Sequence, residues 1–396
     1  MVFALLLTLY VFLVASRADR EFPRGHLQPL GSHQPSEGSI RELDAIPSSE
    51  TFYNDFIHSS RPVLLRNALR SSFPLEKWTD DYLKIRHGDA VVRVDFSKQE
   101  NRDLHARPYV FSDFLEEYNR SEFYLIDTLP DSMQEEFPLL SCLSCGGFLT
   151  TFQDFGMWFS SGGTKSSFHF DTVENLNCQV SGTKEWIFIN KTVPGFHDVI
   201  DHMEGDFSSV NVDAVDMIEF PQFQNVPWWT AVTRPGDCVY VPYKWFHYVK
   251  SLERNLAVNI WWTPFDRFNR SDCQIILDGE KNVLTLSDCH FTPGSQIRFY
   301  VAEMIGRHKG ERMTFEEMHP LLIHEHTGKR LLNVQGFSAL DVDENGYLTR
   351  DEVNGVSVEI FEQHIEAPPG EINTYGASGK MEDDDDEPMN LSHNEL

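Results

Sequence analysis

Eight short segments in which apolar and polar residues alternate, all between Met157 and Trp262, constrain the fold of this chain most. Successive side chains of a strand point to opposite faces, so this period predicts half-buried strands. Turn residues such as Ser181-Gly182 separate them. Many short strands in one stretch predict a double-sheet jelly roll, interrupted by a long loop at 190–227. The predicted strands are Met157–Ser161, Phe168–Phe170, Leu176–Val180, Glu185–Ile189, Trp228–Thr233, Cys238–Val241, Phe246–Lys250 and Leu256–Trp262.

Shorter elements flank this stretch on both sides. After Pro264 the pattern becomes helical, with predicted helices at 295–308 and 314–324. The expected fold is therefore mainly β, a double-stranded β-helix with flanking helices, followed by a small α-helical C-terminal domain. Before the stretch, the pattern predicts helices at 48–58, 75–85 and 111–118 and strands at 61–68, 90–96 and 122–126.

Both ends of the chain have features of a protein that enters the secretory pathway. The segment from Val2 to Val14 is apolar and is followed by small residues, which favours a signal peptide at 1–18 over an uncleaved membrane anchor. The last four residues, His393-Asn394-Glu395-Leu396, resemble the H-D-E-L and K-D-E-L retrieval signals. We therefore expect residence in the endoplasmic reticulum lumen, a retrieval receptor as a partner, and no membrane span in the mature chain.

The composition indicates a globular protein with polar ends. A hydrophobic content of 41% with 13% aromatic residues is enough for a well-filled core. The formal net charge of −28 argues against binding to nucleic acid. Residues 19–47, rich in Pro, Gly and Ser, predict a flexible leader, and 368–396 predict an acidic tail. The main domain is expected at 48–264 and the helical domain at 265–367.

Six cysteines and four glycosylation sequons fit an oxidising, secretory compartment. The sequons are Asn119, Asn190, Asn269 and Asn390. The sequence has one C-x-x-C motif, Cys142-Leu-Ser-Cys145, and not the two that a four-cysteine zinc site needs. Zinc binding by four cysteines is therefore the weaker alternative. The Cys142–Cys145 spacing favours a short structural disulfide over a redox pair, and the spacing of Cys273 and Cys289 allows a second disulfide after the main domain. Cys178 and Cys238 lie in apolar strand patterns and are expected to be buried thiols.

A histidine and a carboxylate two residues apart, His169 and Asp171, stand at one predicted strand. Side chains two apart on a strand share a face, so this pair can bind one metal ion. His247 lies between apolar residues of a later predicted strand. Two histidines and one carboxylate form the ligand set of non-haem Fe(II), which leaves three coordination positions open. We therefore predict that His169, Asp171 and His247 are catalytic iron ligands.

Lys184, directly before the predicted strand Glu185–Ile189, offers a cation to a cosubstrate that carries a carboxylate. A cosubstrate that bound iron through a keto-acid end would leave one position for dioxygen. Its far carboxylate then needs a charge-assisted partner inside an apolar barrel, and Lys184 can provide it. An isolated lysine at a turn would otherwise be a solvated surface residue.

These residues and their spacing resemble the JmjC family of Fe(II)- and 2-oxoglutarate-dependent oxygenases over about residues 48–264. The resemblance is closest to the protein hydroxylase branch and implies a cupin-like jelly-roll core. It implies that Lys184 and the hydroxyl of Ser166 bind the far carboxylate of 2-oxoglutarate. It also implies that Asn175, Asn259 and Tyr124 line the cosubstrate pocket, and that a protein or peptide and dioxygen are the substrates.

A twelve-residue loop at 341–352 has the pattern of an EF-hand calcium loop. Gly346 stands at position 6, where the loop turns sharply. An upstream segment, 306–317, shares Met313 at position 8 and Glu317 at position 12 but lacks oxygen donors at positions 1, 3 and 5. We predict one structural Ca(II) site with a degenerate partner; a solvated acidic turn is the alternative. The predicted ligands are Asp341, Asp343, Asn345, the carbonyl of Tyr347, Thr349 and Glu352.

Three functional hypotheses follow from these sites. The first is an Fe(II)- and 2-oxoglutarate-dependent oxygenase that hydroxylates a protein side chain in the endoplasmic reticulum lumen. The second is a JmjC lysine demethylase, because the same chemistry oxidises N-methyl groups. The third is a non-catalytic calcium-binding scaffold of the same compartment.

Overall fold

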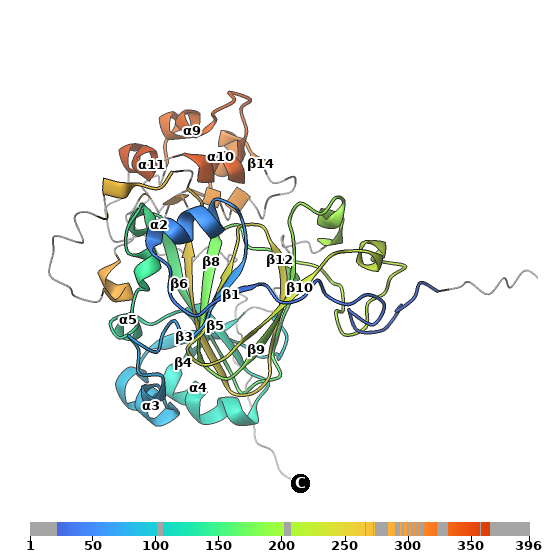
Figure 1. Cartoon of the computed structure of the whole chain (residues 1–396). Helices are drawn as coiled ribbons and strands as arrows, with labels where there is room; N and C mark the ends of the chain where they lie inside the picture. The colour runs from blue at the N-terminus through green and yellow to red at the C-terminus, as the bar shows by residue number, and fades with distance from the viewer. Residues whose placement is uncertain are drawn as a thin grey trace, which may run out of the picture. The chain divides into compact units, whose positions relative to one another are not determined.

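The structure is a computed structural model that describes residues 22–100, 106–201 and 207–265, and then the chain to His364 with short gaps between 266 and 357. The chain divides into two compact units, Met1–Phe291 and Thr292–Leu396, and each is described by itself (Figure 1). The predicted signal peptide, the acidic tail and the retrieval signal lie outside the described residues. No helix among the described residues is long and apolar enough to cross a membrane.

Two β-sheets form the first unit. A nine-stranded mixed sheet has the order β1-β2-β11-β8-β13-β6-β5-β3-β4, and a four-stranded antiparallel sheet has the order β10-β9-β12-β7. The eight strands predicted between 157 and 262 are confirmed as β6 to β13, and the two sheets are consistent with a jelly roll. The strands are β1 Arg41–Leu43, β2 Val63–Leu65, β3 Val91–Asp95, β4 Arg107–Val110, β5 Tyr124–Thr128, β6 Phe152–Ser160, β7 Lys165–His169, β8 Glu174–Ser181, β9 Lys184–Ile189, β10 Trp229–Thr233, β11 Cys238–Val241, β12 Phe246–Ser251 and β13 Asn255–Trp262.

Short helices flank these sheets. The predicted helix at 75–85 is broken by Trp78, so that a 3₁₀ turn precedes α3, whose first turn is capped by the Thr79 hydroxyl. α3 packs beside α4 at the end of the unit that carries β3 and β4 (Figure 1). The helical elements are α2 Ser49–Phe52, η1 Tyr53–Ile57, η2 Leu75–Lys77, α3 Asp80–His87, α4 Phe111–Glu117, η3 Tyr118–Arg120, α5 Asp131–Gln134, η4 Ser141–Leu143, η5 Phe148–Thr150, η6 Phe196–Val199, η7 Pro221–Gln224 and η8 Leu286–Asp288.

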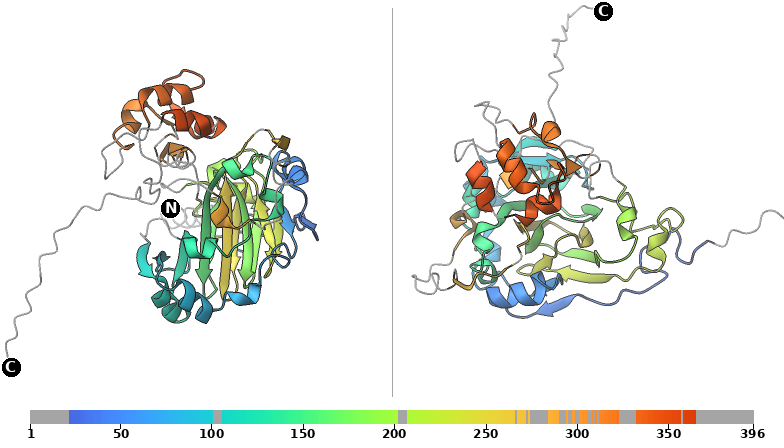
Figure 2. Two further views of the ribbon diagram at one scale, coloured as in Figure 1. Left: turned by 90° about the vertical axis from the view of Figure 1, so that its left-hand side faces the viewer. Right: turned by 90° about the horizontal axis from the view of Figure 1, so that it is seen from above.

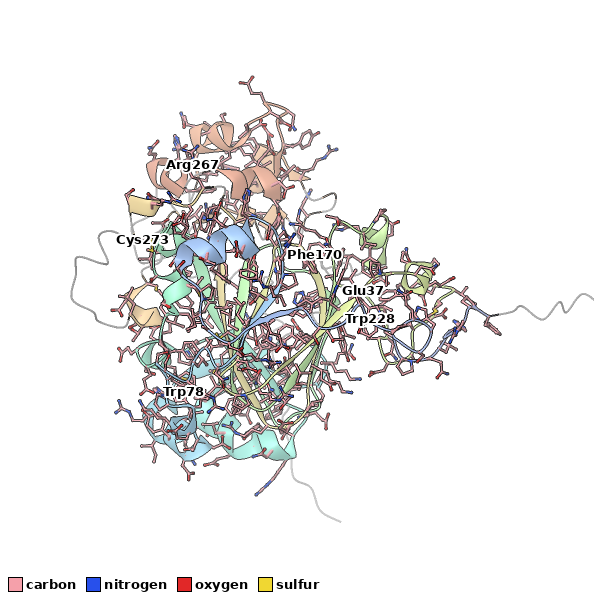
Figure 3. The ribbon with its side chains drawn as sticks, in the orientation of Figure 1. Glu37, Trp78, Phe170, Trp228, Arg267 and Cys273 are labelled. Atoms are coloured by element: carbon pink, nitrogen blue, oxygen red, sulfur yellow. A yellow bond between two sulfur atoms is a disulfide. The ribbon has the colours of Figure 1, made fainter. Side chains whose placement is uncertain are left out.

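Aromatic side chains fill the interior of the first unit. The largest cluster includes Trp78 and Trp262, and a second one, around Phe170 and Trp228, lies under the excursion between β9 and β10. Figure 3 labels Trp78, Phe170 and Trp228 in these regions. Full burial of one such ring stabilises the fold by roughly 1.5–3 kcal/mol, so the buried phenylalanines of these clusters are a large part of the driving force.

Residues 22–47, predicted to be a flexible leader, are fixed by backbone pairing. Leu27 N donates to Val215 O at 2.8 Å, and Leu30 N donates to Val212 O at 2.9 Å. The leader therefore lies beside the excursion at 190–227, as the right view of Figure 2 shows. Further on it forms β1, which pairs in parallel with β2. Pairing with a segment so distant in sequence leaves no local signal, which explains the difference from the expectation.

The disulfide pairs differ from those that the spacing favoured. Cys178 and Cys238, predicted to be buried thiols, form a disulfide because they stand opposite each other on β8 and β11. Cys145 bonds to Cys273, whereas Cys142 and Cys289 are free and buried. The predicted Cys142–Cys145 and Cys273–Cys289 pairs were therefore wrong. Strand register decides the Cys178–Cys238 pair, and the path of the chain after β13 decides the Cys145–Cys273 pair. Neither can be derived from the spacing of the cysteines in the sequence.

The second unit is built from short helices around its own core, which includes Met313, Phe337 and Leu348. Two short strands pair antiparallel, with Met313 opposite Leu348. The predicted helix at 314–324 is shorter than expected, and the one at 295–308 lies partly outside the described residues. The elements are β14 Arg312–Met313, α8 Phe315–Met318, α9 Val334–Leu340, β15 Leu348–Thr349, α10 Arg350–Gly355 and α11 Val358–His364.

Candidate active site

The structure brings the three predicted iron ligands together. His169 ends β7, and His247 on the neighbouring strand β12 is its register partner, so their ring centroids are 4.1 Å apart. Asp171 follows β7, with Oδ1 3.8 Å from His169 Nε2 and Oδ2 3.7 Å from His247 Nε2. One donor atom from each of the three residues lies within 4.8 Å of the others. Three donors facing one point can bind one side of a metal ion.

Both imidazoles are held in the form that a metal requires. His169 Nδ1 lies 2.6 Å from Ser167 O, and His247 Nδ1 lies 3.0 Å from Trp245 O. A carbonyl oxygen only accepts, so each Nδ1 carries the proton and each Nε2 keeps its lone pair for the metal position that the three donors share. Burial, together with the nearby His169, lowers the pKa of His247 to about 4, although Asp171 opposes this shift. His247 is therefore neutral, as a ligand must be.

Backbone and amide groups fix Asp171 between the histidines. Asn175 Nδ2 donates to Asp171 Oδ2 at 2.8 Å, and Lys244 N donates to the main-chain oxygen of Asp171 at 2.9 Å. Lys244 belongs to the tight turn that joins β11 to β12. The turn that introduces His247 thus also holds the third ligand in place.

Lys184 opens β9 and is 2% exposed, so the predicted cation lies inside the barrel. Burial lowers the pKa of its ammonium to about 7, and Glu100 partly opposes the shift. The Nζ atom lies 6.0 Å from the centroid of the Trp186 ring. A buried ammonium with so low a pKa gains from an anionic ligand, because a carboxylate compensates the lost hydration.

Ser166 and Tyr124 form a buried hydrogen-bonded pair. Both are buried, and burial raises the pKa of the Tyr124 phenol well above its usual value, while hydrogen bonds to Ser166 and Thr164 oppose the shift. The charge of Glu100 further raises the pKa of Tyr124. The cation and the two hydroxyls predicted to bind the far carboxylate of a dicarboxylate are therefore all buried in the first unit.

The two predicted amides belong to one hydrogen-bonded group with Asp171. Asn259 Nδ2, from β13, donates to Asn175 Oδ1 at 2.9 Å. Asn177, which the sequence reading missed, donates from Nδ2 to Asn259 Oδ1. The signal was present, because residues 175 and 177 are two apart on a strand and share a face.

Glu174 is a second residue that the sequence reading missed. Its carboxylate accepts from Tyr240 Oη at 2.6 Å and from Tyr243 N at 2.9 Å. Burial raises its pKa to about 7, and these two hydrogen bonds oppose the shift. Because Tyr243 precedes Lys244, Glu174 anchors the same turn that supports Asp171 and His247. A glutamate in an apolar strand pattern was the available signal.

The donor set fits Fe(II) and 2-oxoglutarate. Two imidazoles in the correct tautomer and one carboxylate suit Fe(II), and they come from one side, so positions for further ligands are left. The buried Lys184 suits the distal carboxylate of a chelating keto acid. The site therefore contains the groups that both cofactors need.

A family model described as a cupin-like domain matches residues 48–268 of the 396 in the chain, which is more than half of it. The chain belongs to the cupin-like domain family. All three triad residues, Lys184 and the amide group lie in this cupin-like domain.

Curated relatives with different named activities share the cupin-like domain. "Lysine-specific demethylase 8" of Danio rerio is 26% identical over 269 residues, which is 63% of this chain and 65% of the relative. A "tRNA wybutosine-synthesizing protein 5" of Danio rerio is 25% identical over 252 residues, 56% of this chain and 76% of the relative. A human "bifunctional peptidase and (3S)-lysyl hydroxylase" is 24% identical over 269 residues, 57% of this chain and 84% of the relative. The chain thus spans under two thirds of the demethylase, and the three names do not agree on one substrate.

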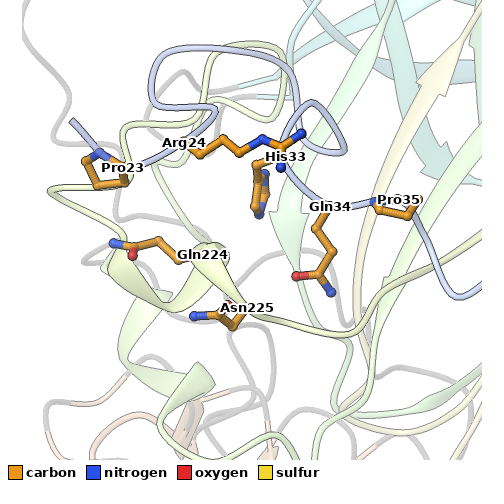
Figure 4. Close-up of a pocket in the computed structure, with 7 residues that line it drawn as sticks. All are labelled: Pro23, Arg24, His33, Gln34, Pro35, Gln224 and Asn225. Atoms are coloured by element: carbon orange, nitrogen blue, oxygen red, sulfur yellow. The ribbon is translucent and has the colours of Figure 1, made fainter. Parts of the chain in front are cut away.

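A separate cavity of about 410 Å³ lies between the leader and the excursion (Figure 4). Its lining residues include Arg24, His33 and Gln224, and none of them belongs to the triad or the lysine pocket. His33 is held there by a hydrogen bond between Nε2 and Phe223 O of 2.9 Å. This cavity is therefore distinct from the candidate active site.

The second unit holds a further group of carboxylates. One carboxylate oxygen from each of Asp341, Asp343 and Glu352 lies within 4.8 Å of the others. The loop turns at Gly346, whose φ of 81° favours glycine. Asn345 N donates to Asp341 Oδ1 at 3.0 Å, and Tyr347 N donates to Asn345 Oδ1 at 2.8 Å. Thr349 caps α10 by accepting from Glu352 N, so its hydroxyl serves the helix.

We expect binding of 2-oxoglutarate to take up a proton at alkaline pH. The free Lys184 has a pKa of about 7, and a bound carboxylate raises it, so affinity is full below pH 7 and falls roughly tenfold per pH unit above it. Calorimetry of the Mn(II)-loaded protein at pH 8, in two buffers of different ionisation enthalpy, measures the uptake, which should approach one proton. The Lys184→Arg variant keeps its charge and should take up none. Equal uptake by both proteins would contradict the assignment.

Proposed function

We propose that the cupin-like domain is an Fe(II)- and 2-oxoglutarate-dependent oxygenase that hydroxylates a protein side chain. The observation that carries this proposal is the convergence of His169 Nε2, His247 Nε2 and the Asp171 carboxylate, with the buried Lys184 in the same domain. Relatives named as a lysine demethylase and a lysyl hydroxylase support a reaction on protein side chains. The formal net charge of −28 makes the tRNA chemistry of the third relative the weaker model.

In this proposal the chain binds and orients the reactants. His169, Asp171 and His247 hold Fe(II), while Lys184, with the hydroxyls of Ser166 and Tyr124, holds the far carboxylate of 2-oxoglutarate. When bound, iron and 2-oxoglutarate supply the oxidising power that inserts one oxygen atom of O₂ into a C–H bond. The chain also keeps water away from the ligands, since the Phe207 ring stacks on His169 at 4.7 Å and Trp186 lies 6.3 Å from His247.

Turnover of 2-oxoglutarate tests the oxygenase proposal. With Fe(II), ascorbate and a panel of peptides from lumenal proteins, the full chain should form succinate and add one oxygen atom to a peptide, seen by mass spectrometry. The His169→Ala variant should lose roughly 100-fold or more of this activity, because it removes a metal ligand. His33→Ala, at the separate cavity, is the matched control and should keep it.

The same assay separates the alternatives. Formaldehyde release from methylated lysine peptides, without stable hydroxylation, would replace the hydroxylase with the lysine demethylase. A wild-type protein that binds neither Mn(II) nor 2-oxoglutarate would leave only the non-catalytic calcium-binding scaffold.

We also propose that the protein works in the endoplasmic reticulum lumen. The apolar segment at 1–18 and the final His393-Asn394-Glu395-Leu396 support this placement. The two disulfides among the described residues suit an oxidising compartment.

Removal of the last four residues tests the placement. The full chain, expressed in animal cells, should remain cell-associated, and the shortened chain should appear in the medium. The proposal would be contradicted if both forms stayed in the cells. It would also be contradicted if the expressed protein still carried residues 1–18.

A second function, calcium binding by the loop 341–352, is favoured by a specific observation. The Glu352 Oε1 atom is buried and has no hydrogen-bond partner among the described residues, although Oε2 accepts from Thr349 N and Oγ1. Together with Asp341 and Asp343, Glu352 completes three carboxylates on one loop that each bring one oxygen within 4.8 Å of the others. The pairing of Leu348 with Met313 supports a degenerate upstream partner for the loop.

We expect the full chain to bind one Ca(II) ion with a Kd on the order of 10⁻⁴–10⁻³ M, as extracellular EF-hand modules do. Glu352→Gln should weaken it at least tenfold, because it removes the bidentate ligand. Glu317→Gln is the matched control, since Glu317 caps α8 as Glu352 caps α10 but stands in the degenerate segment. Calorimetric titration measures the Ca(II) affinity of both variants. If the two substitutions weakened Ca(II) binding equally, Glu352 would act only as a helix cap.

A further inference from the structure

Three amides connect the centre of the barrel to the carboxylate of the triad. Asn177 on β8 donates to Asn259 on β13, Asn259 donates to Asn175, and Asn175 donates to Asp171. The register explains this path, because residues 177 and 259 stand opposite each other on paired strands. All three asparagines are at most 3% exposed. The chain of hydrogen bonds is therefore shielded from water, which would otherwise compete for each amide.

The Asp171 carboxylate sets the direction of every hydrogen bond along these three amides. An ionised carboxylate only accepts, so Asn175 must present Nδ2 to Asp171 and Oδ1 to Asn259. Asn259 must then present Nδ2 to Asn175 and Oδ1 to Asn177. Asn177 is left with its Oδ1 atom pointing away from the chain, and this atom is buried and has no partner among the described residues. Asn177 thus uses its Nδ2 for Asn259 and is the last amide of the path that begins at Asp171.

We propose that Asn177 is a positioning residue for the metal-binding carboxylate of Asp171, acting through Asn259 and Asn175. Its Nδ2 locks the orientation of the Asn259 amide, which locks that of Asn175, and Asn175 holds Asp171 Oδ2 at a fixed angle between the two imidazoles. The inference rests on the proposed function only in that Asp171 binds the metal. A carboxylate that is already oriented before the metal arrives binds it with a smaller loss of conformational freedom.

Gln179 offers a matched comparison on the same strand. It shares the face of Asn177, is fully buried, and its Oε1 atom likewise has no partner among the described residues. Its Nε2 donates to the main-chain oxygens of Ser181 and Leu256 and not to the amide chain. A change at 179 thus removes a buried amide of the same kind without touching the path to Asp171.

The test is Mn(II) affinity of the full chain without 2-oxoglutarate, measured by electron paramagnetic resonance for Asn177→Leu, Gln179→Leu, Asn259→Leu and the Asn177→Leu/Asn259→Leu double variant. We expect Asn177→Leu to weaken Mn(II) binding by roughly threefold to tenfold and Gln179→Leu to leave it unchanged. In a serial path, Asn177 acts only through Asn259, so the double variant should bind as weakly as Asn259→Leu and no weaker.

The outcomes separate this inference from its alternatives. Thermal unfolding in the presence of a chelator shows whether each variant is folded, and Leu at 177 should not lower the midpoint more than Leu at 179. Unchanged Mn(II) affinity for Asn177→Leu, an equal loss for Gln179→Leu, or additive losses in the double variant would each overturn the positioning role. If the wild type itself bound no Mn(II), the proposed function would fail, and the Asn177 inference with it.

Discussion

The antiparallel pairing of β7 with β12 is the interaction on which the active site depends. It places His247 opposite His169, and because Asp171 follows β7 directly, the third ligand arrives without a further element. The register of the β7–β12 pair shifts between His247 and Val249, so the two histidines lie next to a β-bulge or similar irregularity. A shift of one residue in register would turn one imidazole to the other face of the sheet.

The barrel interior combines this metal-binding group with polar residues that a core normally excludes. Lys184, Glu174, Asn175, Asn177 and Asn259 are all nearly fully buried. Each is held by a different compensation: the two hydrogen bonds to Glu174 secure the turn before His247, and the amide chain ends on Asp171. Lys184 has the least compensation, which fits a residue that awaits an anionic ligand. In the proposed function, iron and the far carboxylate of 2-oxoglutarate would supply the charges that this polar interior lacks.

Two units with separate cores divide the tasks of the chain. The cupin-like domain holds the candidate oxygenase site, and the second unit holds the carboxylate loop. The Cys145–Cys273 disulfide and the packing of Leu286 and Cys289 in the first core carry the first unit well past the last barrel strand. The division after Phe291 thus follows from packing and not from the end of the strand pattern.

The sequence alone predicted the eight strands between 157 and 262, because their period of two residues is local, and it predicted which side chains could bind a metal. The candidate ligands could be named from the spacing of His169 and Asp171 and from the position of His247 in a buried strand. Tertiary structure decided the disulfide partners, the pairing of the leader with residues 212–215, and the roles of Glu174 and Asn177. Each of these depends on contacts between segments far apart in sequence, and such contacts follow from strand register, which local patterns do not encode.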